Sequence, residues 1–413
     1  MENQQAMRVI LIGLALILAL STAGNTQALQ RNGDFRVVGY YSYYNIYTLE
    51  YYVTDIPADY LTHLVYANIG ISENGQCVSV DPWTDTDFPY PTDQPFQRLR
   101  GNFHQLQLLE ADNPQLTVMM SIGGWEHSEY FTRVAASEES RQRFAASCVA
   151  FMRQYGFEGI DVDWRYPVSG GLTPGTEADR QNYTLLLQAL RAELDMWEAE
   201  DERIYELSAT LPPFPELVAN YELAELPMYV DFVMLSAFGY EGEWSEITGH
   251  IAPLYLNPRD PRAPEVQGQL TVSGAIDLYL TAGIPAEDIV LGVAFFGQSW
   301  QNVRPNDYFG LFAPHGGIPN GTRAGGRLYY RDLATFLNSP DYTRFFDEEA
   351  DVPWLYNEHS RIAISYENEV SLRYKAAFVR RMGLGGAAAF ELSYDDARHT
   401  LLTTLAVELN GQP

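Results

Sequence analysis

The chain alternates between two patterns of hydrophobic and polar positions. Short runs rich in β-branched and aromatic residues predict strands, and longer stretches with apolar residues every three or four positions predict helices. The runs that predict strands are Arg36–Tyr44, Leu61–Ile71, Gln115–Gly124, Phe157–Trp164, Tyr205–Leu211, Tyr229–Phe238, Ile289–Phe296 and Gly386–Leu392. The stretches that predict helices are Ser137–Tyr155, Asn182–Glu198, Gly274–Ala282 and Leu372–Met382.

The order of these elements predicts an α/β fold. Strands that alternate with helices form a parallel sheet covered by helices. Eight such strands favour a closed (β/α)8 barrel, the TIM barrel, although their spacing alone also fits an open sheet. The segment of about 302–361 interrupts the alternation between the seventh and eighth strands and is rich in aromatic residues. Because these aromatic side chains need burial, we expect an inserted subdomain there instead of a linker.

The N-terminal residues have the pattern of a secretion signal. Val9–Leu20 is one apolar run after Arg8, too short to span a membrane and of the length of a signal-peptide core. Small residues follow, and Ala28 ends a plausible cleavage site before Leu29. We therefore expect a signal peptide at 1–28 and a secreted, extracellular domain at 29–413. An uncleaved anchor is the alternative.

Charge and cysteine content narrow the partners. The 413-residue chain has a formal net charge of −28, which argues against nucleic acid and against anionic membranes. Cys77 and Cys148 have no His or Cys neighbours at metal-ligand spacing, so we expect neither a metal site nor a cofactor. Export would permit a disulfide, but two cysteines alone leave their pairing open. Asn182 and Asn320 begin glycosylation sequons.

The most informative residues lie on the fourth predicted strand. Alternate residues of a strand share a face, so Asp161, Asp163 and Arg165 should point together toward the barrel interior or its mouth, while Trp164 packs outward. Acids in such a place are costly when they are buried without partners. Two interpretations follow from these residues alone: a satisfied charge network in which Arg165 neutralises Asp163, or a row of catalytic groups.

Linked motifs around this strand resemble those of glycoside hydrolase family 18, the chitinases and their inactive relatives. The family has Asp-x-x-Asp-x-Asp-x-Glu and then Tyr-Pro on its fourth strand, and this chain matches at Asp161, Asp163, Tyr166 and Pro167. The third-strand motif Ser-x-Gly-Gly-Trp is present as Ser121–Trp125. Further matches are Val37–Tyr41, Leu61–His63, Thr248–Tyr255 and Gly383–Gly386. The resemblance runs from about Arg36 to the end of the chain, and implies a (β/α)8 barrel with an α+β insertion that takes chitin or related N-acetylglucosamine glycans.

The departures from the family pattern fall on its catalytic positions. Arg165 stands where the family has its acid Glu, and Glu158 stands where the motif begins with Asp. An ungapped match to the sixth-strand motif Met-x-Tyr-Asp places Phe238 and Gly239 at the Tyr and Asp that hold the substrate's N-acetyl group. Phe390 replaces the Trp under the central sugar. An arginine stays protonated and cannot give a proton to a leaving oxygen, so we expect a pseudoenzyme that binds glycans without cleaving them.

The resemblance and the strand ends together give a set of candidate site residues. The former catalytic positions are Asp161, Asp163 and Arg165. The candidate substrate contacts are Trp125, Tyr166, Phe238, Tyr240, Glu241, Trp244 and Phe390. Two alternatives stay open. One is an active, endo-acting glycosidase on β-1,4-N-acetylglucosamine polymers, with its acid relocated to Glu241 or Glu126. The other is a scaffold whose barrel rim binds a protein partner.

Overall fold

The structure is a computed structural model that describes residues 35–319 and 324–411. Parallel strands form a barrel, which closes because β1 pairs with both β14 and β2. The eight barrel strands are β1 (Arg36–Ser42), β2 (His63–Ile71), β4 (Thr117–Gly123), β5 (Gly159–Asp163), β6 (Glu206–Leu211), β7 (Phe232–Leu235), β8 (Ile289–Ala294) and β14 (Gly386–Phe390). The predicted (β/α)8 barrel is therefore confirmed.

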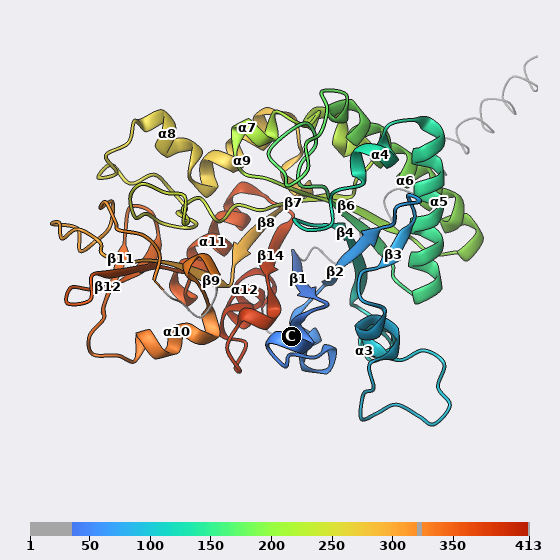
Figure 1. The fold of residues 1–413 in the computed structure, drawn as a ribbon, viewed down its shortest axis with the longest axis horizontal. Coiled ribbons are helices and arrows are strands. Elements are labelled where there is room, and N and C mark those ends of the chain that lie inside the picture. Colours follow the sequence, from blue (N-terminus) through green and yellow to red (C-terminus); the bar gives the residue numbers. More distant parts are fainter. Residues whose placement is uncertain (1–34, 320–323, 412–413) are drawn as a thin grey trace, which may run out of the picture. The chain divides into compact units, whose positions relative to one another are not determined.

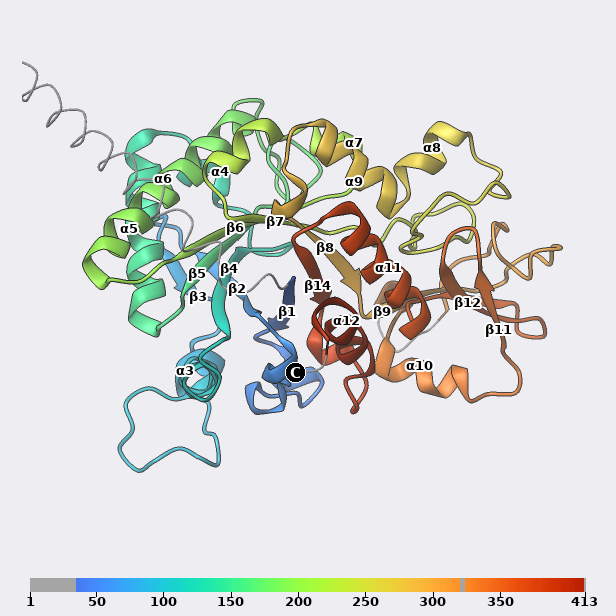
Figure 2. The same cartoon turned by 180° about the vertical axis from the view of Figure 1, so that it is seen from behind.

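Helices cover the outside of the barrel, and Figures 1 and 2 show the two long helices α5 and α6 side by side. The α-helices are α2 (Asn45–Thr48), α3 (Gly101–Asp112), α4 (Phe131–Ala135), α5 (Glu138–Tyr155), α6 (Asp179–Asp201), α7 (Pro215–Val218), α8 (Pro264–Gln269), α9 (Val272–Thr281), α10 (Tyr330–Leu337), α11 (Glu369–Met382) and α12 (Thr400–Asn410). Local sequence fixes the ends of α5, where Ser137 caps the first turn and Gly156 ends the helix with a φ of 86°.

Apolar side chains from most of the strands fill the barrel interior. The buried cluster consists of Val38, Tyr40, Val65, Met119, Phe232, Met234, Val290 and Ala388. Phe390, at the end of β14, packs on this cluster and remains partly exposed. Because the strands are parallel, their carboxyl ends meet at one end of the barrel, and the polar residues described below lie there.

A second sheet follows β8, and Figure 1 shows it to one side of the barrel strands with α10 next to it. Its strands run in the order β10 (Arg327–Tyr329), β9 (Phe296–Trp300), β13 (Ile362–Ser365), β12 (Val352–Asn357) and β11 (Thr343–Asp347), all antiparallel. β9 and all of β13 lie outside the predicted limits of the insertion, about 302–361, so the second sheet extends beyond both ends of that segment. β9 starts two residues after β8 ends, so the apolar run predicted as one strand, Ile289–Phe296, contains β8 of the barrel and the first residue of β9 in the second sheet.

Cys77 and Cys148, whose pairing the sequence left open, form a disulfide. It ties β3 (Cys77–Ser79), an antiparallel strand beside β2, to the middle of α5. Across residues 35–319 and 324–411, no helix is both long and apolar enough to cross a membrane. The predicted signal peptide at 1–28 and the sequon residue Asn320 lie outside the described residues.

Candidate active site

Asp161 is the buried centre of the polar network inside the barrel. Hydroxyl groups from three other strands donate to its carboxylate: Ser121 at 2.7 Å, Ser208 at 2.9 Å, Thr210 at 3.0 and 3.2 Å, and Tyr40 at 3.4 Å. Burial raises the pKa of Asp161 to about 6, and the nearby Asp163 adds to the rise. None of these four donors was among the predicted site residues, although Tyr40 and Ser121 lie within the matched motifs and all occupy inward positions of strands.

Asp163 and Arg165 form an ion pair at the end of β5. The Nε of Arg165 donates to Oδ1 of Asp163 at 2.6 Å, and the backbone N–H of Arg165 donates to Ser128 at 2.9 Å. Burial disfavours the charge on Arg165, but the adjacent Asp163 carboxylate outweighs this and raises the pKa of the guanidinium. The predicted inward row of Asp161, Asp163 and Arg165 is confirmed, and so is the outward position of Trp164, which stacks on Phe131.

Aromatic rings form a floor beside this polar row. Phe238 stacks on Phe390 with 5.5 Å between the ring centroids, and Tyr40 lies 5.8 Å from Phe390. The chain thus brings together two of the predicted substrate contacts. Next to Phe238, Gly239 has a φ of 74°, and a Cβ at this position would meet no atom within 4 Å. Space therefore exists beside the floor for a side chain that glycine does not provide.

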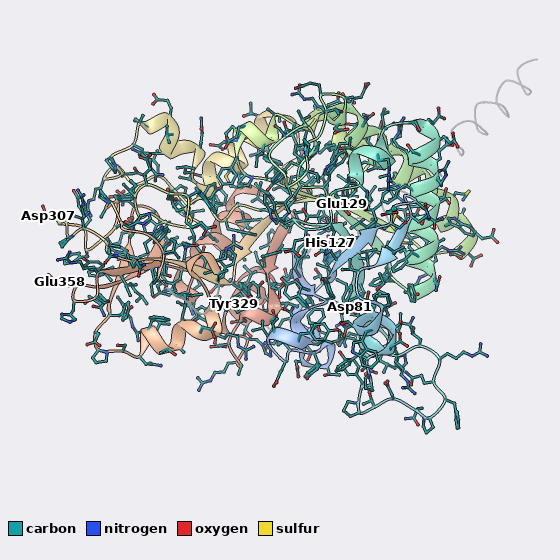
Figure 3. All side chains as sticks on the ribbon, in the orientation of Figure 1. Asp81, His127, Glu129, Asp307, Tyr329 and Glu358 are labelled. Atoms are coloured by element: carbon teal, nitrogen blue, oxygen red, sulfur yellow. A yellow bond between two sulfur atoms is a disulfide. The ribbon has the colours of Figure 1, made fainter. Side chains whose placement is uncertain are left out.

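Two predicted contacts form one edge of the site, while a third stands apart. Trp125, on the loop after β4, is 46% exposed and approaches Tyr166 edge-on at 6.5 Å. His127 and Glu129, labelled in Figure 3, follow on the same loop, and the ring of Tyr43 lies 6.4 Å from His127.

Trp244 is the predicted contact that stands apart. It is 61% exposed, and its ring lies against Gly242 of its own loop.

Tyr240 and Glu241 do not have the environments that a ligand contact needs. Tyr240 is only 2% exposed and its hydroxyl donates to the carbonyl of Thr271, so the prediction that its ring serves as a sugar platform is wrong. Glu241 is buried, where it forms an ion pair with Arg262 and accepts a hydrogen bond from Ser245 at 2.6 Å. Burial raises the pKa of Glu241, but both carboxylate oxygens are already occupied by these partners, which contradicts its use as a relocated acid.

Glu391 is a buried acid for which the sequence predicted no partners. Ser42, Asn45 and Ser393 donate to its carboxylate, and burial raises its pKa. The Oδ1 of Asn45 has no hydrogen-bond partner there. Within the described part of the chain, no group of three or more His, Cys, Asp and Glu side chains is arranged to hold a metal.

Comparison of the sequence with models of known protein families identifies the family of this chain. The family model described as "Glycosyl hydrolases family 18" matches residues 36–395, which takes in every barrel strand and the second sheet. The chain belongs to glycosyl hydrolase family 18. Membership agrees with the resemblance that the strand motifs suggested, and with the barrel and its insertion.

Relatives in family 18 carry chitinase names. The chain is 35% identical to chitinase A1 of Niallia circulans over 96% of its own length and 62% of the relative. It is 32% identical to chitinase 1 of Aphanocladium album over 93% of its own length and 88% of the relative. Among solved structures, a chitinase from Bacillus thuringiensis superposes with a TM-score of 0.87 at 31% identity, covering 92% of this chain and 70% of that one.

Proposed function

We propose that this member of family 18 is a secreted, catalytically silent protein that binds chitin or related N-acetylglucosamine glycans. The observation that carries the proposal is the ion pair between Arg165 and Asp163, because the strand motif aligns Arg165 with the family's acid Glu. A side chain held in this way is not swung out of the site, and among the described residues no other acid forms a hydrogen bond with the Asp163 side chain.

The chemistry of family 18 explains why this exchange matters. In substrate-assisted hydrolysis the sugar's own N-acetyl oxygen attacks, and a protein acid must protonate the departing glycosidic oxygen. A guanidinium keeps its proton at all ordinary pH values. It also places a fixed positive charge near a transition state that is itself positively charged. Loss of general acid help alone costs on the order of 10²–10⁴ in rate.

A second loss acts on the nucleophile. The aligned positions Phe238 and Gly239 supply neither the hydroxyl nor the carboxylate that hold the N-acetyl group in the family. The open space next to Gly239 is consistent with a missing side chain. Positioning of the attacking oxygen is a separate contribution from proton transfer, so the two losses multiply.

Binding has more support than turnover. Trp125 presents exposed aromatic surface with the half-buried Tyr166 beside it, and Phe238 and Phe390 stack on each other as a floor. Aromatic faces beside polar groups suit sugar rings, which have both apolar faces and hydroxyl edges. The names of the relatives support chitin as the glycan, since they are called chitinases.

The test combines hydrolysis of tetra-N-acetylchitotetraose with pull-down on chitin beads, both with purified protein. We expect pull-down without hydrolysis, and Trp125→Ala should weaken the pull-down by about tenfold, as expected for one aromatic contact. Trp197→Ala is the matched control, because it removes a Trp from the outer helix α6. Hydrolysis by the wild type that Glu126→Gln abolishes would establish the active-glycosidase alternative. Neither hydrolysis nor pull-down would favour the protein-binding scaffold.

A further inference from the structure

Arg165 carries hydrogen-bond donors that the protein leaves unused. A guanidinium has five N–H donors in a planar fork. In the described residues, the side chain of Arg165 makes one hydrogen bond, from Nε to Asp163, so neither terminal Nη group has a protein acceptor. The side chain is 22% exposed, which leaves the fork reachable from solvent while most of the residue is fixed. Half-buried charged donors of this kind require water or a ligand acceptor.

The surroundings of the fork identify what can bind there. Asp163 holds the guanidinium through its Nε donor. The two Nη groups at the end of the side chain therefore stay available to a ligand. Arg165 directly precedes Tyr166, whose ring lies 6.5 Å from that of Trp125, so the residue adjoins the aromatic edge of the site. Two parallel Nη donors match the two oxygens of a carboxylate in a bidentate contact.

We propose that Arg165 binds a carboxylate carried by an N-acetylated amino-sugar glycan, so that the site prefers an anionic glycan over neutral chitin. The inference rests on the proposed function and names its ligand class. The aromatic rings receive the sugar faces, as in the proposal above, and the Nη pair receives the acid group. Charge-assisted hydrogen bonds are about twice as strong as neutral ones, so the acid group should contribute more than a sugar hydroxyl at the same place.

The acidic surface of the chain does not prevent this contact. The net charge of −28 slows the approach of an anion over long distances. At physiological salt, however, the Debye length is about 8 Å, so distant charges are largely screened while a direct guanidinium contact is not. Measurements of the preference therefore belong at physiological ionic strength.

The experiment compares three tetrasaccharides by calorimetry. The first alternates N-acetylglucosamine with N-acetylmuramic acid and so adds two carboxylates to a chitin-like backbone. The second is the dimethyl ester of the same molecule, which keeps its shape without the charges. The third is tetra-N-acetylchitotetraose. We expect the acid to bind about tenfold more tightly than the ester, in line with one charge-assisted contact.

Variants of Arg165 assign the preference to its side chain. In Arg165→Gln the affinities for acid and ester should become equal, and in Arg165→Lys part of the preference should remain, because the charge is kept and the fork is lost. Arg98→Gln is the matched control, since it removes the same charge from an exposed loop before α3 and should leave the preference intact. Each ratio is measured within one folded preparation, so a change in stability does not imitate the effect.

The outcomes separate this inference from the proposed function. Binding of tetra-N-acetylchitotetraose with equal affinities for acid and ester would overturn the anionic preference and leave the glycan-binding proposal standing. Failure of all three sugars to bind would overturn both. A preference that survives in Arg165→Gln would place the acid group elsewhere and would also overturn the inference.

Discussion

Asp161 shows how the barrel treats a buried acid at the level of single residues. Its carboxylate has no cation partner among the described residues, and hydroxyl groups from β1, β4 and β6 surround it. Neutral donors of this kind offset part of the cost of burying a charge, but burial still prevails and the pKa rises to about 6. The stability of the fold should therefore depend on the pH near this residue.

The substitution Asp161→Asn tests this dependence. The folded-state pKa of about 6 lies above the value of about 3.9 for an unfolded aspartate. The stability contributed by Asp161 is thus fully present below about pH 4 and is lost as the pH rises through about 6. The unfolding free energy of the wild type, relative to Asp161→Asn, should fall by roughly 3 kcal/mol between about pH 4 and pH 7. Denaturant titrations over this range measure it, and a difference that stays constant with pH would contradict it.

Arg165→Glu tests whether the acid alone limits turnover. We expect this single variant to hydrolyse tetra-N-acetylchitotetraose no faster than Arg165→Gln, which lacks a proton donor, because Phe238 and Gly239 still fail to hold the nucleophile. The triple variant that adds Phe238→Tyr and Gly239→Asp should release reducing ends faster than either single variant. An Asp tolerates the left-handed backbone at this position better than most residues do, and its Cβ has free space. Robust turnover by the single variant would show that the acid was the only missing part.

The sequence predicted the directions of site residues better than their surroundings. Strand alternation correctly turned Asp161 and Asp163 inward and Trp164 outward, because it depends only on the backbone. Nearness to the end of a strand, the basis for choosing Tyr240 and Glu241, was a weaker guide, because both residues follow β7 and are buried. Their burial depends on Thr271 and Arg262, from segments that the sequence does not show to be close in space.

The disulfide between Cys77 and Cys148 acts at the level of elements, since it joins a three-residue strand to a long helix. Short edge strands such as β3 have few bonds of their own. The sequence separation of 71 residues means that the crosslink closes a long loop in the unfolded chain. A crosslink of this length is worth about 4 kcal/mol in the chain-entropy model.

The double variant Cys77→Ala and Cys148→Ala measures this contribution. We expect its unfolding free energy to fall by about 2–4 kcal/mol, with the fold retained in the circular dichroism spectrum. Wild type treated with a reducing agent is a second route to the same state. An unfolding free energy that neither treatment changes would mean that β3 and α5 are held together by packing alone.

The predicted bounds were accurate for helices with a strong periodic pattern. They were too wide for a strand that is followed by an apolar turn. The helix predicted at Ser137–Tyr155 corresponds to α5 (Glu138–Tyr155). The strand predicted at Tyr229–Phe238 is only β7 (Phe232–Leu235), because the backbone of Ala237 and Phe238 bonds to carbonyls two residues earlier instead of to a neighbouring strand. Hydrophobic pattern does not distinguish a strand from the apolar turn that follows it.

Charge is a property of the whole molecule. Figure 3 shows Asp307 and Glu358 at one end of the described unit, with Asp81 and Glu129 nearer the barrel strands. With a net charge of −28, acids distributed in this way repel one another in the compact state. Salt screens this repulsion, so we expect the melting temperature to rise by roughly 5 °C between about 10 mM and about 0.5 M NaCl.

Calorimetric scans across this range of salt check the prediction. Equal concentrations of a neutral osmolyte serve as the control, because they do not screen charge. A melting temperature that falls with NaCl would mean that the ion pairs, such as those of Arg153 and Arg191, outweigh the repulsion among the unpaired acids.

The ion pair between Arg165 and Asp163 bears on whether the change from Glu to Arg could be reversed. Under the proposed function, the change from Glu to Arg supplied Asp163 with a cation and removed a crowding of like charges from the end of β5. A reversion would restore that crowding at once, but under the proposed function it would restore no hydrolysis until Phe238 and Gly239, which follow β7, had also changed back. If the proposed function holds, no single substitution leads back toward an enzyme, and further changes at the barrel mouth would act on binding alone.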